Sequence, residues 1–178
     1  MARMNTSPEP LHAIVAETAL GFAGVALSSR GIRYATLLHT TRDACESELA
    51  AHGATFDQDS RAEEVVALLK GYALGDASLD DYPVDIPPGG ELQSRVWAAL
   101  RDVPRGETRS YGWLTRHVGE PMGAARAVGA AVGSNPIPLW LPCHRIIGSD
   151  GSLHGFGGGL AMKQALLEVE GALPKTLI

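Results

Sequence analysis

Cys143 and His144 stand side by side in the largely apolar stretch IPLWLPCHRIIGSDG. A cysteine thiolate is a strong nucleophile, and a nearby imidazole can take the proton of the thiol. An unpaired cysteine is also among the residue types most often buried in a protein core. The pair therefore indicates either a thiol nucleophile or a structural cysteine on a core strand.

A nucleophilic thiol needs a base, and the base needs a group that orients it. Neighbouring side chains on an extended strand point to opposite faces, so a strand here would keep His144 from touching Cys143 directly. A bridging water or a bend in the strand would connect them. The segment KQALLEVEG offers Glu168 and Glu170 as partners for the imidazole, and their spacing leaves both open.

The chain has 178 residues, which suits one large domain or two small ones. Its two cysteines, Cys45 and Cys143, lie far apart and form no CxxC pair, so a disulfide between them is the less expected alternative. The first residues, MARMNTSPEPLHAIV, lack the apolar core of a signal peptide, and no apolar run is long enough to span a bilayer. We therefore expect a cytoplasmic protein.

The net charge of −5 is distributed unevenly along the chain. Residues 1–90 carry 6 Lys or Arg against 13 acidic residues, whereas residues 91–178 carry 9 against 7. Five arginines crowd one short segment: Arg95, Arg101, Arg105, Arg109 and Arg116. This asymmetry points weakly to a nucleic-acid face on the second half, and a solvated helix face with scattered arginines explains it equally well.

The first half is expected to form a small sheet and two helices. Apolar segments alternate with turn signals over residues 11–39, which indicates an antiparallel sheet. Helical spacing covers residues 40–53 and 61–75. The stretch DDYPVDIPPGGE, residues 80–91, gathers prolines and glycines and indicates a linker or extended crossover at a domain boundary.

The second half is expected to be mostly helical. ELQSRVWAALRDVP, residues 91–104, has an apolar stripe, and RSYGWLTRHVG, residues 109–119, indicates a short helix with Ser110 as its N-cap. The turn GEPMG and a second helix over residues 124–135 follow. Helix, tight glycine-containing turn and helix form the helix-turn-helix pattern.

The helix expected over residues 124–135 is built almost wholly of Ala, Gly and Val. Gly129 and Gly133 each cost about 1 kcal/mol relative to Ala inside a helix. Close packing against another helix would explain them, and so would close approach to a bulky partner, with Arg126 as the one long side chain. A major-groove reader needs several polar side chains at base edges, so we expect contact with the minor groove instead.

The stretch NPIPLWLPCHRIIGSDG, followed by GFGGGLAMKQALLEVEG, resembles the O6-alkylguanine-DNA alkyltransferases, also called methylated-DNA–protein-cysteine methyltransferases. The tetrapeptide PCHR behind Asn-Pro-x-Pro is highly specific, and the resemblance is strong from Gln93 to Gly171. It implies an α+β chain with a small RNase H-like α/β domain over residues 1–88. Residues 89–178 would form a mostly helical domain with a winged-helix-like helix-turn-helix. We expect a monomer that needs no cofactor.

The resemblance also implies catalytic roles. Cys143 matches the acceptor that takes the alkyl group from guanine O6 in one irreversible displacement. His144 matches the water-linked base, and Glu170 rather than Glu168 matches the carboxylate behind it. Asn135 matches the residue that braces the turn before the active strand.

Further roles concern DNA and the substrate pocket. Arg126 matches an arginine finger that fills the gap left by a flipped nucleotide. Tyr111 matches a tyrosine that presses on the phosphate and helps to protonate the leaving guanine at N3, and Pro138 matches a pocket wall. Three more positions match residues that touch the DNA backbone: Gln93, Gly112 and Ser149.

Phe156 and Gly157 depart from the family pattern, which commonly has Tyr followed by Ser in the pocket loop. Both hydroxyls are missing, so a donor to guanine O6 there must be a backbone N–H, and the preference among alkyl groups stays open. His154 near this loop is expected to be an exposed loop histidine. Cys45 is the only cysteine of the first half, so we expect no zinc or other metal.

The expected function is direct-reversal DNA repair. The protein would flip O6-alkylguanine out of duplex DNA through the minor groove, with little sequence preference, and transfer the alkyl group to Cys143. The thioether product has no leaving route, so this methyltransferase would act once. The alternatives are a lesion-binding protein without repair activity, a helix-turn-helix regulator and a thiol hydrolase. Duplex DNA is the expected partner, and no membrane is involved.

Overall fold

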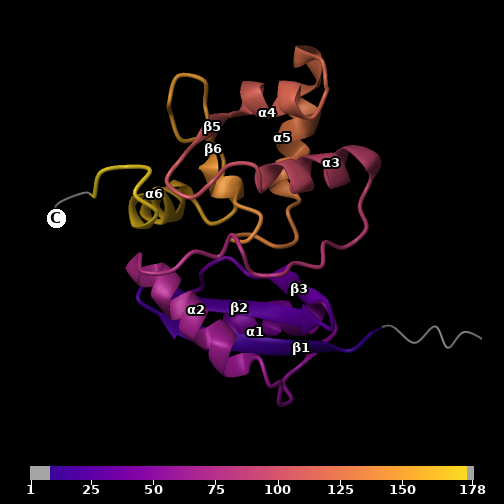
Figure 1. Ribbon diagram of the computed structural model, residues 1–178, viewed down its shortest axis with the longest axis vertical. Helices are drawn as coiled ribbons and strands as arrows, with labels where there is room; N and C mark the ends of the chain where they lie inside the picture. Colours follow the sequence, from indigo (N-terminus) through magenta and orange to yellow (C-terminus); the bar gives the residue numbers. More distant parts are fainter. Residues whose placement is uncertain (1–8, 176–178) are drawn as a thin grey trace, which may run out of the picture.

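A computed structural model describes residues 9–175 of the chain. Residues 1–8 and 176–178 lie outside this part. The expectation that the first residues form no signal peptide therefore concerns mostly residues outside the described part. Among the described residues the fold is mixed α+β, with a curled sheet below a group of helices (Figure 1). No helix in the described part is both long and apolar enough to cross a membrane.

The expected antiparallel sheet is confirmed. Strands β1 (Leu11–Thr18), β2 (Gly21–Ser28) and β3 (Gly31–Ala35) form a meander, with Ile14 opposite Val25 in the β1–β2 pair. A two-residue strand, β4 (Ala54–Thr55), pairs in parallel with β1 and completes the order β3-β2-β1-β4.

Two helices cover the sheet, as their spacing predicts. Helix α1 (Arg42–Ala51) begins at the cap residue Thr41, and helix α2 (Ala62–Leu74) ends at Gly75 with a φ of +87°. Leu49 of α1 clusters with Ala13 and Ala26, whereas the α2 residues Val65 and Leu69 cluster with Ile14 and Val25. Since these strand positions alternate, α1 and α2 cover opposite faces.

The proline-rich segment after α2 is an extended crossover that packs along β3. Asp85 is buried, accepts a hydrogen bond from Ser28 Oγ at 2.7 Å, and pairs with Arg30 and Arg33. The carbonyl of Pro83 accepts from the N–H of Ile32 at 3.0 Å. Gly31 permits this approach, because a Cβ there would lie 2.4 Å from Pro83 O.

The second half contains the three expected helices in the expected order: α3 (Glu91–Leu100), α4 (Tyr111–His117) and α5 (Ala125–Gly133). A fourth helix, α6 (Leu160–Val169), forms in a segment for which no helix was predicted. The 3-10 turn η1 (Met122–Ala124) joins α4 to α5. Ser110 caps α4 as expected, since its Oγ accepts from the N–H of Trp113 at 3.0 Å.

The second half also contains strands that were not expected. Two short strands, β5 (Arg109–Ser110) and β6 (Ile146–Ile147), pair in parallel and join the start of α4 to the segment after Cys143. One continuous apolar core includes Val25 of the sheet, Trp97 of α3 and Leu166 of α6. The two halves therefore pack against each other through shared side chains.

Candidate active site

The turn before Cys143 is braced by Asn135. Its Nδ2 donates to Leu141 O at 2.6 Å, and its Oδ1 accepts from the N–H of Ile137 at 2.9 Å. Within this turn Leu139 has a φ of +74°, a left-handed conformation that costs a non-glycine residue about 1–2 kcal/mol. The surrounding contacts over-determine this backbone and hold Cys143 at a fixed place.

Cys143 does not lie on an extended strand, and that expectation was wrong. It begins a 3-10 turn, η2 (Cys143–Arg145), which Arg145 N closes by donating to Pro142 O at 3.0 Å. Strand β6 starts only afterwards, at Ile146. A 3-10 turn has three residues per turn, so the side chains of Cys143 and His144 diverge by about 120° rather than pointing to opposite faces.

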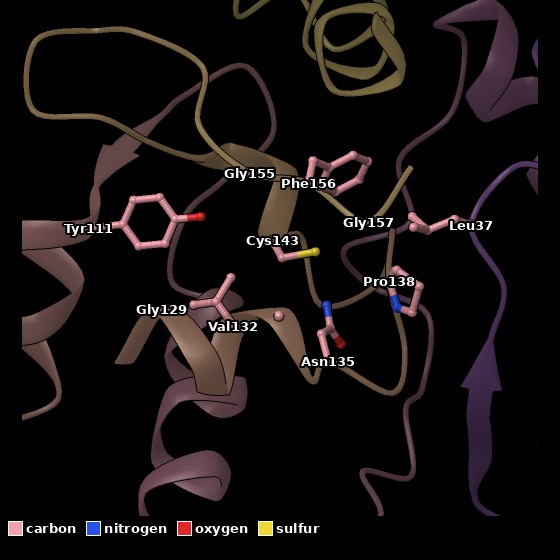
Figure 2. Close-up of a pocket in the computed structure, with 11 residues that line it drawn as sticks. Leu37, Tyr111, Gly129, Val132, Asn135, Pro138, Cys143, Gly155, Phe156 and Gly157 are labelled. Carbon is pink, nitrogen blue, oxygen red and sulfur yellow. The ribbon is translucent and has the colours of Figure 1, made fainter. Parts of the chain in front are cut away.

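The Cys143 thiol opens into a cavity of about 100 Å³ (Figure 2). Tyr111 lies on one side of the sulfur, and Pro138, Gly157 and Leu37 lie on the other. The cysteine is only 8% exposed, as a structural cysteine would be, but it lines a hollow instead of packing against apolar side chains on every side. This geometry favours the nucleophile over the core cysteine.

Burial raises the pKa of the Cys143 thiol. A hydrogen bond with Asn135, the charge of Lys163 and the N–H groups of Cys143 and His144 act in the opposite direction. The resting thiol is therefore protonated, and these groups reduce the cost of forming the thiolate in the cavity.

Lys163 belongs to this site, and the sequence reasoning missed it. The side chain is buried on α6, and its Nζ donates to His154 O at 3.0 Å and to Ile146 O. Nζ also lies 5.9 Å from the ring of Tyr111. Burial lowers the pKa of Lys163, while the Cys143 thiolate would raise it. The signal was the lysine within GGLAMKQALLEVEG, because a lysine is rarely fully buried without partners.

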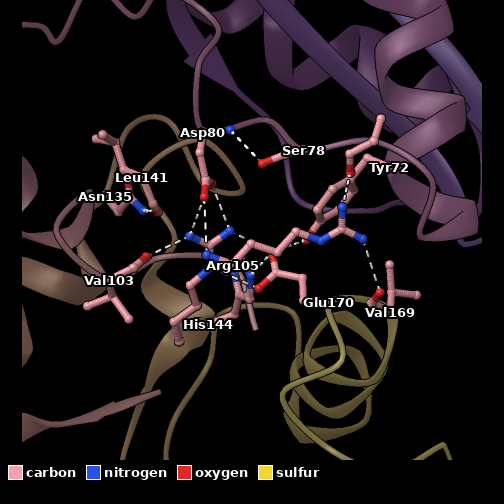
Figure 3. Close-up of polar contacts among 12 residues, drawn as sticks. Tyr72, Ser78, Asp80, Val103, Arg105, Asn135, Leu141, His144, Val169 and Glu170 are labelled. Carbon is pink, nitrogen blue, oxygen red and sulfur yellow. Dashed lines mark hydrogen bonds and ion pairs between the residues drawn. The ribbon is translucent and has the colours of Figure 1, made fainter. Parts of the chain in front are cut away.

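His144 is held by Glu170, the carboxylate that the resemblance selects (Figure 3). Its Nε2 lies 2.9 Å from Glu170 Oε1, and both side chains are fully buried. Glu168 instead accepts from Gln164 at 2.8 Å. The bond to a carboxylate fixes the proton on Nε2, so Nδ1 of His144, which has no partner among the described residues, is left as a base.

Glu170 is shared by two further side chains. Tyr72 Oη donates to Oε1 at 2.9 Å, and Arg145 Nε donates to Oε2 at 2.8 Å. Burial alone would raise the pKa of Glu170, but the hydrogen bonds and charges of His144 and Arg145 outweigh it and hold this pKa well below its usual range. The carboxylate stays ionised behind the imidazole.

Arg145 ties this cluster to the crossover. Its Nη2 donates to Asp80 Oδ1 at 2.8 Å, and its Nη1 donates to Val103 O at 2.7 Å. Burial would lower the pKa of Arg145, but the bonds to Glu170 and Asp80 raise it above its ordinary value. The guanidinium is therefore a permanent charge that fixes the orientation of Glu170.

The exposed face of α5 leads toward the cavity. Arg126, Gly129 and Gly133 follow one another at helical spacing, and both glycines line the cavity. A Cβ added at either glycine would meet no described atom within 4 Å outside its own helix backbone, so close packing against another helix does not explain them. Arg126 is exposed, and its side chain forms no bond within the described part of the chain. This smooth face is available to a partner.

Most of the clustered arginines serve the fold. Four of them donate to carbonyl or carboxylate groups of the protein itself: Arg95, Arg101, Arg105 and Arg109. Arg105, for instance, donates to Ala77 O at 2.6 Å and to Gly75 O at 2.7 Å. Arg116 is exposed, with Nη1 3.6 Å from Met122 Sδ. The cluster is therefore not a continuous basic patch.

The other expected DNA contacts lie outside the cavity. Gln93 joins the start of α3 to the end of α5 by donating to Ser134 Oγ at 3.0 Å. Gly112 lies in the first turn of α4, where a Cβ would lie 3.5 Å from Met122 Cε. Ser149 is exposed in the loop after β6.

The loop after β6 closes the cavity with Gly155, Phe156 and Gly157, all without hydroxyls. His154 is exposed, as expected, and its Nε2 lies 2.7 Å from Ser152 Oγ. Cys45 is buried on α1, with Sγ 3.3 Å from Thr36 Oγ1, and is not joined to Cys143. In the part of the chain that the structure describes, no three His, Cys, Asp or Glu side chains gather as metal ligands would.

Fold and site together define a mixed α+β protein in which a helix-turn-helix adjoins a cavity with a thiol and a buried imidazole–carboxylate pair. Residues 91–172 match the family described as 6-O-methylguanine DNA methyltransferase, DNA binding domain. The protein in a crystal structure of Mycobacterium tuberculosis OGT in complex with DNA is 38% identical in sequence to this chain. The two structures align with a TM-score of 0.75, and the alignment covers 90% of this chain and 93% of that one. The chain belongs to the O6-methylguanine DNA methyltransferase family.

Curated relatives agree with this assignment. A methylated-DNA–protein-cysteine methyltransferase of Mycolicibacterium paratuberculosis is 51% identical over 105 residues, 59% of this chain and 62% of the relative. One of Shigella flexneri is 46% identical over 105 residues, 59% of this chain and 61% of the relative. The aligned part therefore spans less than two thirds of these relatives' length.

Proposed function

We propose that this protein repairs O6-alkylguanine in duplex DNA by flipping the damaged nucleotide out and transferring its alkyl group to Cys143. The carrying observation is the Cys143 thiol in a cavity that opens beside the smooth, exposed face of α5. The names of the curated relatives and the DNA complex of the mycobacterial neighbour support the same activity. Chemistry on a base within a duplex requires that the base leave the stack.

In the proposed step a bond forms between Cys143 Sγ and the alkyl carbon, while the bond from that carbon to guanine O6 breaks. The thiol proton passes through a water to Nδ1 of His144, and Glu170 stabilises the resulting imidazolium. The released electron pair enters the guanine, which Tyr111 protonates at N3. The proton held by His144 then restores Tyr111 through solvent. The net transfer is one proton to guanine and one alkyl group to sulfur.

Nothing in this step needs a metal or a cofactor, because the thiolate supplies the nucleophile and the stable thioether ends the reaction. Each molecule would therefore act once, as a methylated-DNA–protein-cysteine S-methyltransferase. Pro138, Phe156 and Gly157 would enclose the base and its alkyl group, with a backbone N–H as the donor to O6.

The DNA would be bound through its minor groove. The face of α5 lacks long side chains apart from Arg126, so the helix can approach the duplex closely while Arg126 fills the gap left by the flipped nucleotide. Gln93, Gly112 and Ser149 would contact the backbone. With one long side chain on this face, recognition depends little on sequence.

The same proposal covers the two domains, the oligomeric state and the location of the protein. Residues 1–88 would form an RNase H-like domain and residues 89–178 a winged-helix-like DNA-binding domain, consistent with the crossover between α2 and α3. The protein would act as a monomer in the cytoplasm, away from membranes.

A titration with duplex DNA that contains one O6-methylguanine tests this function. One equivalent of methyl should move to the peptide that contains Cys143, and a second equivalent of DNA should stay methylated. The Cys143→Ala variant should bind the same duplex without transfer. Tight binding by the reduced wild type without any mass gain would instead favour a lesion-binding protein.

A further inference from the structure

A second hollow, of about 580 Å³, adjoins the Cys143 cavity. One wall is the segment after β3, with Leu38 and His39, together with Glu48 of α1 and the following His52. Further lining comes from the turn at Asn135–Pro138 and from Gly157 and Gly158. We call this hollow the side groove.

The side groove and the cavity share a neck. Leu37, Asn135, Pro138 and Gly157 line both. A Cβ on Gly157 would lie 3.3 Å from Leu37 Cδ1, so a side chain at position 157 would crowd Leu37 and narrow this neck. Figure 2 shows Leu37, Pro138 and Gly157 on the side of Cys143 opposite to Tyr111. A group attached to sulfur or to O6 therefore meets the neck on the side away from Tyr111.

One end of the side groove, which the Cys143 cavity does not share, is lined by Glu48 together with the imidazoles of His39 and His52. Glu48 is the only carboxylate among its described lining residues, and none of these is Lys or Arg. Glu48 Oε2 lies 2.6 Å from Nε2 of His39, and the two side chains are 42% and 28% exposed. A cationic or hydrogen-donating group that reached this end would meet a carboxylate, whereas an anionic group would be repelled.

We propose that the side groove is a subsite for the distal part of long O6-substituents, and that it prefers a cationic end to an anionic one. This inference rests on the proposed transfer to Cys143. The apolar neck accepts an aromatic or aliphatic stem, and Glu48 selects the charge of the end. A methyl group is too short to leave the cavity, so methyl transfer is independent of Glu48.

The test compares four duplexes of one sequence that carry a methyl, a benzyl, a 4-(aminomethyl)benzyl or a 4-carboxybenzyl group on guanine O6. Single-turnover rates of transfer to Cys143 are measured for each. The ammonium-bearing benzyl group should react about five-fold faster than the carboxylate-bearing one, as suits a half-exposed charge pair.

The Glu48→Lys variant should reverse this order and leave the methyl rate unchanged. Glu46→Lys is the matched control, because Glu46 lies on the same helix, pairs with Arg42 at 3.5 Å and does not line the side groove. This control changes the net charge equally and should keep the wild-type order.

Three outcomes separate the subsite from the proposed function. Methyl transfer without any benzyl transfer overturns the subsite. The subsite is also overturned if the two charged benzyl groups react at equal rates in the wild type and still do so in the Glu48→Lys variant. Absence of methyl transfer overturns the proposed function. In that case the affinities of the two charged duplexes decide the subsite, which fails if Glu48→Lys does not reverse their order.

Discussion

His144 and Glu170 face each other with 2.9 Å between Nε2 and Oε1, and neither side chain is exposed to solvent. The carboxylate also accepts from Arg145 and Tyr72, so three side chains depend on one residue. An imidazole held in this way keeps one tautomer and one orientation. The same contacts connect the chemistry of the site to the stability of the fold.

Glu170→Gln should therefore lower both activity and stability. Loss of one partner from a buried ion pair costs about 3 kcal/mol when a second carboxylate remains, and Asp80 still pairs with Arg145 in this variant. Urea unfolding at pH 7 measures the effect. Glu168→Gln is the control, because a replacement at a partly exposed position should change stability by about 0.5 kcal/mol or less.

The same residue predicts how stability depends on pH. The pKa of Glu170 is lowered in the fold, so its contribution is fully present above the pKa of an unfolded-chain glutamate, about 4.3, and is lost as the pH falls below that value. The difference in unfolding free energy between wild type and Glu170→Gln should therefore shrink from pH 5 to pH 3. A constant difference over this range would contradict the assignment.

Lys163→Met should raise the pKa of Cys143, since the charge of Lys163 lowers it. A higher thiol pKa leaves less thiolate at pH 7, so alkyl transfer would slow and the pH–rate profile would move to higher pH. Thiolate absorbance, read as a difference from the Cys143→Ser variant, checks the pKa directly. A slower reaction with an unshifted profile would mean that Lys163 acts only through packing.

Arg126→Ala should slow transfer from duplex DNA much more than transfer from a free O6-benzylguanine base. The side chain is exposed and unbonded within the described chain, so its loss leaves the fold intact and removes only the group that replaces the flipped nucleotide. Single-turnover rates with both substrates provide the comparison. Equal slowing of the two reactions would reject the finger role.

Gly129→Leu should separate stability from DNA binding. The glycine costs α5 about 1 kcal/mol, and a Cβ at this position would meet no described atom within 4 Å outside the helix backbone, so the variant should unfold at a higher urea concentration. The same side chain stands on the face proposed to meet DNA, and the affinity for duplex should fall. Unchanged affinity would show that this face of α5 is not the contact surface.

The sequence predicted the elements that have strong periodicity. The antiparallel sheet, the helices α1 to α5 and the Ser110 cap appear where apolar spacing, turn signals and cap residues placed them, whereas no helix was predicted at α6. The strands β4, β5 and β6 have two residues each, which is too short for an alternating pattern to be read. Their pairing depends on segments distant in the chain.

The sequence alone predicted less of the active site than of the fold. Spacing alone could not choose between Glu168 and Glu170, because the choice depends on how α6 packs against the turn that holds His144. The strand expected at Cys143 does not form, because the N–H of Arg145 donates to the carbonyl of Pro142 and closes a tight turn there. The arginine cluster could not be interpreted from composition, since the acceptors that engage Arg105 come from another segment.

The close contact between Gly31 and Pro83 has a consequence for how the protein accommodates an alkylated base. Pro83 belongs to the crossover that joins α2 to α3, and it packs against β3 without room for even one methyl group on Gly31. Bending of the chain at Pro83 would have to break this contact and the hydrogen bond from Ile32, so the crossover is fixed to β3 at that point. We therefore expect single side chains that line the cavity, more than movement between the two halves, to decide which alkyl groups are accepted.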